Sequence, residues 1–444
     1  MVSDQRSGPV AAGAEWPSPG YAWYVVFVLM VAYTLSYIDR TIVDLLVGPI
    51  KADLGLTDTQ FSLLRGLAFA VFYTLLGIPL GQLADRRHRG RLIAAGIALW
   101  SIATALCGAA RSFPQLFAAR MAVGVGEAAL TPAAYSMIAD SFPPERRGRA
   151  FGVYASGIYV GIGLAIIIGG LVVQAVSAQP SVRLPLLGEV RAWQAAFLVV
   201  GLPGLVVAAW ILTLREPIRR VQPGDAHAPT FRAAFAFLGA HRGLFLAHFT
   251  GFALLTLLFN AITAWIPAYL TRVHGYAPGQ IALSYGPILL VFGSAGIFCG
   301  GWFADWLRKR GRADAEIRAG VVGALCLWPF AATATLMPDA QLFFVMLAPF
   351  VFFASFPFAP AAAALQLVTP NRLRGQVSAV YLFVVNLTGI GLGGTITALL
   401  TDGLFGRDDA VGYSMALVGV VAAPLAALVL RAGLPYFRRS VDAA

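Results

Sequence analysis

The sequence YTLSYIDRTIVD, residues 33–44, lies inside an apolar run over residues 22–47 that is long enough to cross a bilayer. It places Asp39 beside Arg40, although an ionised side chain near the middle of a membrane helix costs about 2.5–3.5 kcal/mol. Asp39 lies about 100° to the side of Arg40 on a helical wheel. The other polar or aromatic residues on the face of Arg40 are Tyr33, Tyr37 and Asp44. We interpret this face as the wall of a polar path through the membrane.

The composition excludes a soluble protein. Of the 444 residues, 59% are hydrophobic and 12% are charged, whereas a soluble globular protein carries about 25% charged residues. The net charge of +11 would suggest nucleic acid as the partner of a soluble protein. Here Lys and Arg instead cluster in short loops on one side, which is the positive-inside pattern. We therefore expect a multi-pass membrane protein with both termini in the cytoplasm and no nucleic-acid partner. Frequent Arg, Ala and Gly suggest a bacterial inner membrane.

Twelve apolar segments are long enough to form membrane-spanning helices, since about 20 residues cross the hydrocarbon layer. Their hydrophobicity is uniform rather than alternating, which excludes a porin-like barrel. The predicted spans are Ala22–Val47, Thr59–Leu83, Leu92–Ala110, Gln115–Phe142, Phe151–Ala175, Gln194–Leu214, Gly243–Arg272, Gln280–Leu307, Arg318–Met337, Gln341–Val368, Gln376–Leu400 and Val411–Leu430.

The longest cytoplasmic loop, residues 215–242, divides the spans six and six and is predicted to link two halves. The halves repeat. GQLADRRHR at residues 81–89 ends the second span, and GWFADWLRK at residues 301–309 ends the eighth. A second repeat relates Pro143, Arg147, Gly148 and Tyr154 to Pro370, Arg374, Gly375 and Tyr381.

The predicted fold is an all-α membrane protein of twelve transmembrane helices, in two six-helix bundles related by pseudo-two-fold symmetry. The predicted divisions are a cytoplasmic N-terminal tail (1–20), the first bundle (21–214), the cytoplasmic linker (215–242), the second bundle (243–436) and a cytoplasmic C-terminal tail (437–444). This duplicated architecture is typical of rocking transporters, whose substrate site lies between the halves near the midplane.

The motif over residues 81–89, between spans two and three, resembles the signature loop of the major facilitator superfamily. Three stretches resemble the spinster branch of that family, particularly its bacterial members: SYIDR at 36–40, ARMAVGVGEA at 119–128 and IADSFPPERRG at 138–148. Related organic-anion transporters share parts of these stretches. The resemblance covers essentially the whole chain. It implies the facilitator fold and, since spinster relatives are associated with export of lysolipids and sphingoid phosphates, a lipid-like substrate, with proton coupling in some members.

Three more charged residues lie well inside predicted spans, away from their ends: Arg65, Arg120 and Glu127. Arg120 and Glu127 share a helical face but lie about 10 Å apart along the axis, so each is expected to meet a group from another span. The structural alternative is a buried ion network that clamps the first bundle. Because buried ion pairs are often energetically neutral, stability alone explains such a network poorly. We therefore assign transport roles to Asp39, Arg40 and Glu127. Arg65 and Arg120 serve as substrate contacts or counter-charges.

The charges of the site predict an anionic substrate. Three Arg against Asp39 and Glu127 leave a positive surplus, and Arg binds phosphate or carboxylate through two parallel hydrogen bonds. Tyr33 and Tyr37 are expected to line the same site. Protons are the expected coupling ion, carried by Asp39 or Glu127, because alternating access changes the burial and the neighbours of a carboxylate. No metal and no other cofactor is expected.

The second half differs, because its predicted spans carry no Asp, Glu, Lys or Arg well inside the membrane. Near mid-depth lie Asn260 and Asn386, for which substrate contact and an interhelical hydrogen bond are equally good explanations. One charged wall and one apolar wall fit an amphiphile better than a sugar.

The cytoplasmic loops carry charges expected to act as a gate. Four residues are placed to form an ion cluster between the bundles that locks an outward-facing state: Asp85, Arg89, Asp140 and Arg147. Arg86, and Asp305 in the repeated motif, belong to the same gating set. The alternative is that these charges only set the topology.

The sequence therefore predicts a proton-coupled, alternating-access transporter of an anionic amphiphile, of the lysophospholipid or sphingoid-phosphate kind, acting as a monomer among membrane lipids. The alternative is a transporter of soluble organic anions such as carboxylates, using the same arginines without the apolar wall. A channel or receptor fits less well, because a channel does not need two matched gates. An enzyme is not predicted, since the sequence shows no nucleophile–base constellation, metal-ligand spacing or phosphate-binding loop.

Overall fold

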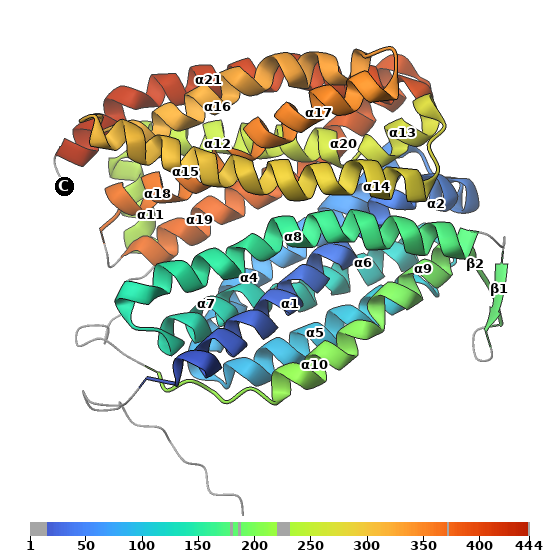
Figure 1. Ribbon diagram of the computed structural model, residues 1–444, viewed down its shortest axis with the longest axis horizontal. Coiled ribbons are helices and arrows are strands. Elements are labelled where there is room, and N and C mark those ends of the chain that lie inside the picture. The colour runs from blue at the N-terminus through green and yellow to red at the C-terminus, as the bar shows by residue number, and fades with distance from the viewer. Residues whose placement is uncertain (1–15, 178–180, 185–187, 220–230, 371–372, 443–444) are drawn as a thin grey trace, which may run out of the picture.

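The computed structural model describes residues 16–177, 181–184, 188–219, 231–370 and 373–442, and these are almost entirely helical. Two bundles of long helices lie side by side, the blue-to-green first half against the yellow-to-red second half (Figure 1). Among the described residues, 11 helices are long and apolar enough to cross a membrane. The fourth predicted span is present as two shorter helices, α6 (Phe113–Glu127) and α7 (Leu130–Ser141). The predicted all-helical membrane architecture is confirmed.

The first half also contains two short strands, which the sequence did not predict. They pair antiparallel, with Val182 opposite Val190. The remaining elements of this half are α1 (Pro19–Leu45), α2 (Val47–Leu54), α3 (Asp58–Ser62), η1 (Leu63–Leu67), α4 (Ala68–Arg86), α5 (Arg89–Cys107), α8 (Pro144–Ser177), β1 (Ser181–Leu184), β2 (Gly188–Arg191), α9 (Ala192–Gly201) and α10 (Pro203–Leu212).

The second half begins with a short helix before its first span. Its elements are α11 (Phe231–Ala240), α12 (Arg242–Thr263), α13 (Ile266–His274), α14 (Pro278–Ile288), η2 (Leu289–Gly293), α15 (Ser294–Lys309), α16 (Ala315–Thr333), η3 (Ala334–Leu336), α17 (Ala340–Ser355), α18 (Phe358–Val368), α19 (Arg374–Asn386), η5 (Leu387–Leu392), α20 (Gly393–Leu399), η6 (Leu400–Phe405), η7 (Asp408–Ala410) and α21 (Val411–Asp442). Of these, η2, η5 and η6 are π-helical, as is η1 in the first half.

Several predicted spans are interrupted, and a proline lies at or just beyond each break. A proline ring clashes with the carbonyl four residues earlier and supplies no N–H, so the regular helix ends there. The prolines are Pro132 in α7, Pro203 in α10, Pro267 in α13 and Pro360 in α18. The break before α7 matters most, because it comes directly after Glu127.

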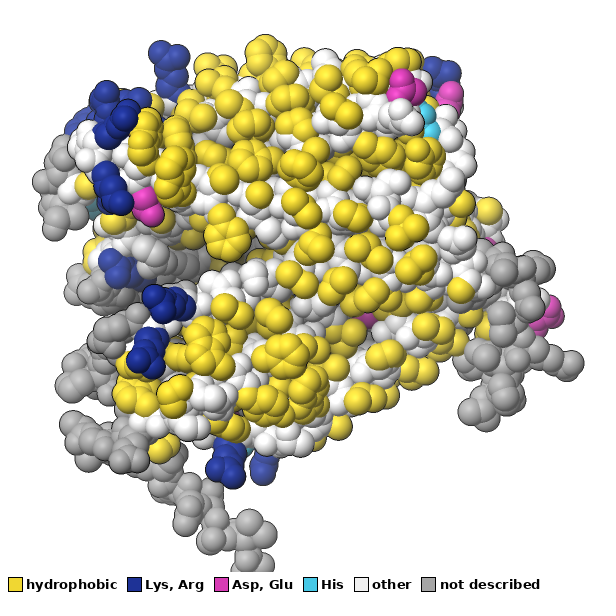
Figure 2. Space-filling model, in the orientation of Figure 1, with side chains coloured by type: hydrophobic (Ala, Val, Ile, Leu, Met, Phe, Trp, Pro, Cys, Tyr) yellow, Lys and Arg dark blue, Asp and Glu magenta, His cyan; other side chains and the backbone are white. Residues whose placement is uncertain are grey.

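The two ends of the molecule differ. We name the end where α1 begins and α21 ends the tail end, and the opposite end, which carries β1 and β2, the hairpin end (Figure 1). On the face shown in Figure 2, Lys and Arg side chains gather mostly at the tail end. This distribution agrees with the charge asymmetry of the loops.

Among the described residues, the apolar core that the two halves share lies at the hairpin end. There, side chains of the first half such as Ile42 and Leu64 belong to the same buried cluster as Trp265 and Tyr285 of the second half. Towards the tail end, the buried side chains of the first half form a cluster of their own, against which Ile390 of the second half packs. The two halves therefore share most of their buried apolar contacts at the hairpin end.

Glycines on the facing helices show the same asymmetry. A Cβ atom added at Gly66 would lie 2.6 Å from the carbonyl oxygen of Ile390, and one added at Gly163 would lie 2.8 Å from Cβ of Leu290. Such backbones approach too closely for any side chain. Nearer the tail end, a Cβ atom on Gly77 or Gly152 would meet no atom within 4 Å. Among the described residues, the close glycine contacts between the halves therefore lie away from the tail end.

Candidate functional site

An ion pair between two helices lies at the centre of the first half. Arg40 on α1 donates from Nε to Oε2 of Glu127, the last residue of α6, at 2.5 Å. The Glu127 side chain is fully buried, whereas that of Arg40 keeps 14% of its surface exposed. The pair fulfils the expectation that Glu127 meets a group from another span. The exposed part of the guanidinium can still receive an anion.

Aromatic rings surround the Arg40 guanidinium. Its central carbon lies 4.6 Å from the ring centre of Phe69, 4.7 Å from Tyr73 and 5.0 Å from Tyr37. Rings at these distances attract the cation and fix its orientation. Tyr33 stands edge-on to Tyr37 at 5.3 Å. The predicted Tyr33 and Tyr37 thus lie beside Arg40. Phe69 and Tyr73 on α4 were not predicted, because nothing in the sequence distinguishes them from packing residues.

Asp39 and Arg120 form a second, fully buried group. The Asp39 carboxylate has 0% of its surface exposed, and neither oxygen has a hydrogen-bond partner among the described residues. Its charged neighbours are Glu127, Arg120 and Arg40. Arg120 donates to the backbone carbonyl of Asp39 at 3.2 Å. A buried carboxylate with poor hydrogen bonding is costly when ionised, and the nearby Trp100, Arg120 and Arg40 offset part of that cost.

Arg65 pairs with Asp44, a residue left out of the charge count made from the sequence. The guanidinium of Arg65 on η1 binds both oxygens of Asp44 on α1, at 2.6 and 3.1 Å. Asp44 is only 5% exposed, so it belongs to the same interior. The expected positive surplus was therefore wrong: with Asp44 included, the buried carboxylates match the arginines. A positive charge appears only when one carboxylate takes up a proton.

An apolar side chain of the second half reaches this site. Ile390 on η5 packs against the cluster that contains Phe69. Asn260 is half-buried and donates to the carbonyl of Thr256 on its own helix at 3.0 Å. Asn386, the last residue of α19, is half-buried. For Asn260 the structure shows a hydrogen bond within its own helix rather than between helices.

The predicted gate residues at the tail end lie in a cluster within the first half. Arg89 is fully buried and pairs with Asp140 on α7. It also donates to Glu216 at 2.6 Å and to the carbonyl of Pro217 at 2.7 Å, at the start of the linker. The cluster thus anchors the linker to the first half. Glu216 was missed, although its place directly after the sixth span was a usable signal.

Of the other predicted gate residues, the structure describes the side chains of two. Arg86 and Asp305 are exposed at the ends of α4 and α15. The side chains of Asp85 and Arg147 lie outside the described residues. The gate expected between the bundles at this end stays a prediction.

Two repeated helical bundles, joined at one end and parted at the other around buried charges, define a secondary transporter. The chain belongs to the Major Facilitator Superfamily, which its residues 29–394 match. That family comprises transporters rather than enzymes, so the absence of an enzymatic constellation in the sequence is explained.

Individual proteins are similar over nearly the whole chain. An MFS-type efflux pump of Mycolicibacterium smegmatis is 30% identical over 92% of this chain and 91% of its own. A D-galactonate transporter of Escherichia coli is 27% identical over 92% of this chain and 94% of its own. Among solved structures, a bacterial homologue of the human lysosomal transporter spinster, inward-facing and unoccupied, superposes with a TM-score of 0.76 at 27% identity, covering 96% of this chain and 98% of that one. The occupied form gives a TM-score of 0.75. The expected resemblance to bacterial spinster homologues is confirmed.

Proposed function

We propose that the protein couples protons to the movement of an anionic amphiphile, such as a lysophospholipid or a sphingoid phosphate, by alternating access. The observation that carries this proposal is the Arg40–Glu127 pair, with the Arg40 side chain 14% exposed and that of Glu127 fully buried. An anionic headgroup would bind Arg40, and the acyl chain would lie against the apolar wall of the second half. The protein acts as a monomer in contact with membrane lipids.

The pairing suggests how protons and anion are linked. While Glu127 is ionised, it neutralises Arg40 at 2.5 Å. A proton on Glu127 releases the guanidinium, which can then bind phosphate or carboxylate with charge-assisted hydrogen bonds. Anion and proton therefore bind together at this site. The buried carboxylate of Asp39 offers a second place for the proton.

The orientation of the protein in the membrane follows from the distribution of Lys and Arg and from the similarity to solved structures. The tail end, where Lys and Arg gather, faces the cytoplasm by the positive-inside rule. The parted tail end agrees with the similarity to structures described as inward-facing. We infer that this structure is open to the cytoplasm of a bacterial cell, across the inner membrane.

The second candidate is a transporter of soluble organic anions, favoured by the similarity to a D-galactonate transporter. Such a substrate would use the same arginine without an acyl chain. The two candidates differ in what the second half must contact, because only the amphiphile needs its apolar wall.

Binding measured by native mass spectrometry tests the proposal. The purified protein is mixed with lysophosphatidic acid or with a dicarboxylate of similar charge. We expect the lysolipid to bind, and Arg40→Gln to weaken its binding at least about tenfold, since a charged hydrogen bond is lost. Arg111→Gln, at an exposed position away from the site, is the matched control and should bind normally. Binding of the dicarboxylate alone would favour the second candidate, and equal binding by the Arg40 variant would overturn both.

A further inference from the structure

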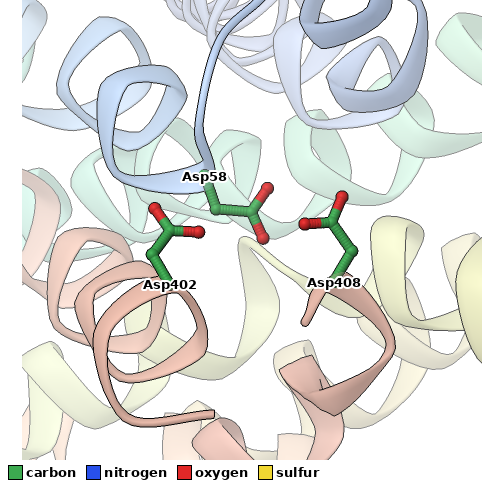
Figure 3. A group of neighbouring side chains, drawn as sticks. All are labelled: Asp58, Asp402 and Asp408. Atoms are coloured by element: carbon green, nitrogen blue, oxygen red, sulfur yellow. The ribbon is translucent and has the colours of Figure 1, made fainter. Parts of the chain in front are cut away.

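Charged side chains from both halves meet at the hairpin end, outside the candidate site. We name them the latch: Lys51 and Asp58 from the first half, and Arg272, Asp402 and Asp408 from the second. The three Asp side chains of the latch converge in Figure 3. Unlike the buried charges of the site, they connect the two halves directly.

Asp58 is the centre of the latch. Its carboxylate is fully buried and accepts a hydrogen bond from the ammonium group of Lys51, in the same half, with an N–O distance of 2.6 Å. The guanidinium of Arg272 binds the same carboxylate with two hydrogen bonds, of 2.6 and 2.7 Å, from the other half. Lys51 in turn reaches across to Asp408 at 2.7 Å. Each half therefore supplies a cation to a carboxylate of the other half. Lys51 of the first half pairs with Asp408, and Arg272 of the second half pairs with Asp58.

Asp402 adds a contact of a different kind. It accepts hydrogen bonds from the backbone N–H and the hydroxyl of Thr59, at 2.7 and 2.6 Å. Thr59 lies in the first turn of α3, where backbone N–H groups have no partner within the helix. A residue of the second half thus caps a helix of the first, and a carboxylate there is favoured by the helix dipole.

Three converging carboxylates also resemble a cation site, since their oxygens lie within 4.8 Å of one another. Here Lys51 and Arg272 already hold the oxygens of Asp58. A metal ion would have to displace both cations from a buried position. The geometry therefore points to a contact between the halves and not to metal binding.

The tail end has no equivalent among the residues that the structure describes. The ion pairs described there join elements of the same half: Arg89 with Asp140 and Glu216, Arg308 with Glu316, and Arg438 with Asp314. Among the ion pairs described, those that join the two halves therefore lie at the hairpin end. We propose that the latch sets the resting state of the protein, and that it must break once in each cycle to open the hairpin end.

This inference rests on the alternating access proposed above and is tested by measuring the two ends separately. Cys107, Cys299 and Cys326 are replaced by alanine, and spin labels are attached in pairs at exposed positions: Ala52 with Ala277 at the hairpin end, and Arg87 with Lys309 at the tail end. Asp58→Asn removes the central charge of the latch. We expect the hairpin-end distances to lengthen and the tail-end distances to shorten, with the ratio of the two states changed about tenfold or more.

Asp409→Asn is the matched control. Asp409 lies in the same loop as Asp408 but pairs only with Arg407, and both side chains are more than half exposed. Its loss should leave both distance distributions unchanged. If Asp58→Asn does not reach the membrane, Arg272→Gln takes its place, because it removes the partner from the other half. Unchanged distances in the latch variants would overturn the latch, while unchanged lysolipid binding in the same variants would leave the proposed substrate standing.

Discussion

At the scale of single residues, Arg40 has two kinds of partner. Glu127 neutralises its charge, and three aromatic rings hold its plane. The rings favour the same position of the guanidinium when the carboxylate is neutralised, because each aromatic face attracts a cation placed over it. In the proposed mechanism, Arg40 exchanges Glu127 for the substrate anion while the rings hold its position.

The first prediction concerns Glu127→Gln. Because the amide leaves Arg40 positive at every pH, anion binding should become tight and independent of pH. In the unmodified protein, binding should strengthen as the pH falls, by up to about tenfold per pH unit for one linked proton. Native mass spectrometry at acidic and neutral pH, together with pH-driven uptake into vesicles, measures both. Persistent pH dependence in the variant would move the coupling role to Asp39.

The second prediction concerns Asp44→Asn. It leaves Arg65 with an unpaired charge in a mostly buried place, which should lower stability by about 3 kcal/mol. The double variant Asp44→Asn with Arg65→Gln should recover much of that loss. Thermal unfolding in detergent compares the three proteins. A single variant as stable as the parent would show that water reaches Arg65 and that this pair does not clamp the bundle.

The sequence located these residues but not their partners. Asp39, Arg40 and Glu127 stand out because ionised groups are rare inside apolar spans. The pairing of Arg65 with Asp44 depends on how far η1 turns the guanidinium towards α1, and hydrophobic pattern does not encode that angle. The charge count from the sequence omitted Asp44, although Asp44 shares the helical face of Arg40 in the first span.

At the scale of helices, π-helical turns lie where the halves approach each other. The turns η1 and η5 carry Gly66 and Ile390, whose backbones face each other across the interface. A π-helical turn inserts an extra residue and changes the direction of the side chains that follow. In η1 this turn positions Arg65 beside the very glycine that lets the halves touch.

The third prediction compares two glycines of the same span. Gly66→Ala adds a methyl group 2.6 Å from the backbone oxygen of Ile390, so it should destabilise the closed hairpin end by about 1–3 kcal/mol. Gly77→Ala adds one where no atom lies within 4 Å, and should be neutral or stabilising because alanine favours helix. Spin-label distances at the hairpin end and unfolding temperatures distinguish them. Equal behaviour of the two variants would contradict the close contact.

The helices themselves were predictable, and their breaks were nearly so. The lengths of the apolar segments defined the spans. Pro132 is visible in the sequence, and its ring would clash with the carbonyl of Ala128 in a regular helix. The hairpin of β1 and β2 was not, since it is short and separate from the hydrophobic pattern. The approach of η1 to η5 depends on the packing of distant segments, which no local pattern specifies.

At the scale of the whole molecule, each half supplies part of the other's core at the hairpin end. The fourth prediction follows: with the chain divided within residues 220–230, each half alone should be degraded in the membrane, and the two made together should recover a complex. A tag on one half and detection of the other measure recovery. Asp58→Asn in the first half should reduce it. A first half that is stable alone would contradict the shared core.

The shared core also has a consequence for biosynthesis. A ribosome delivers the first six spans to the membrane before the rest exist, so side chains such as Ile42 and Leu64 must rest for a time against lipid. Before the second half is made, the first half can complete only the buried cluster that it forms by itself, nearer the tail end. Folding is thus completed when the second half packs onto the first at the hairpin end. Substitutions at that end should slow maturation before they impair any mature molecule.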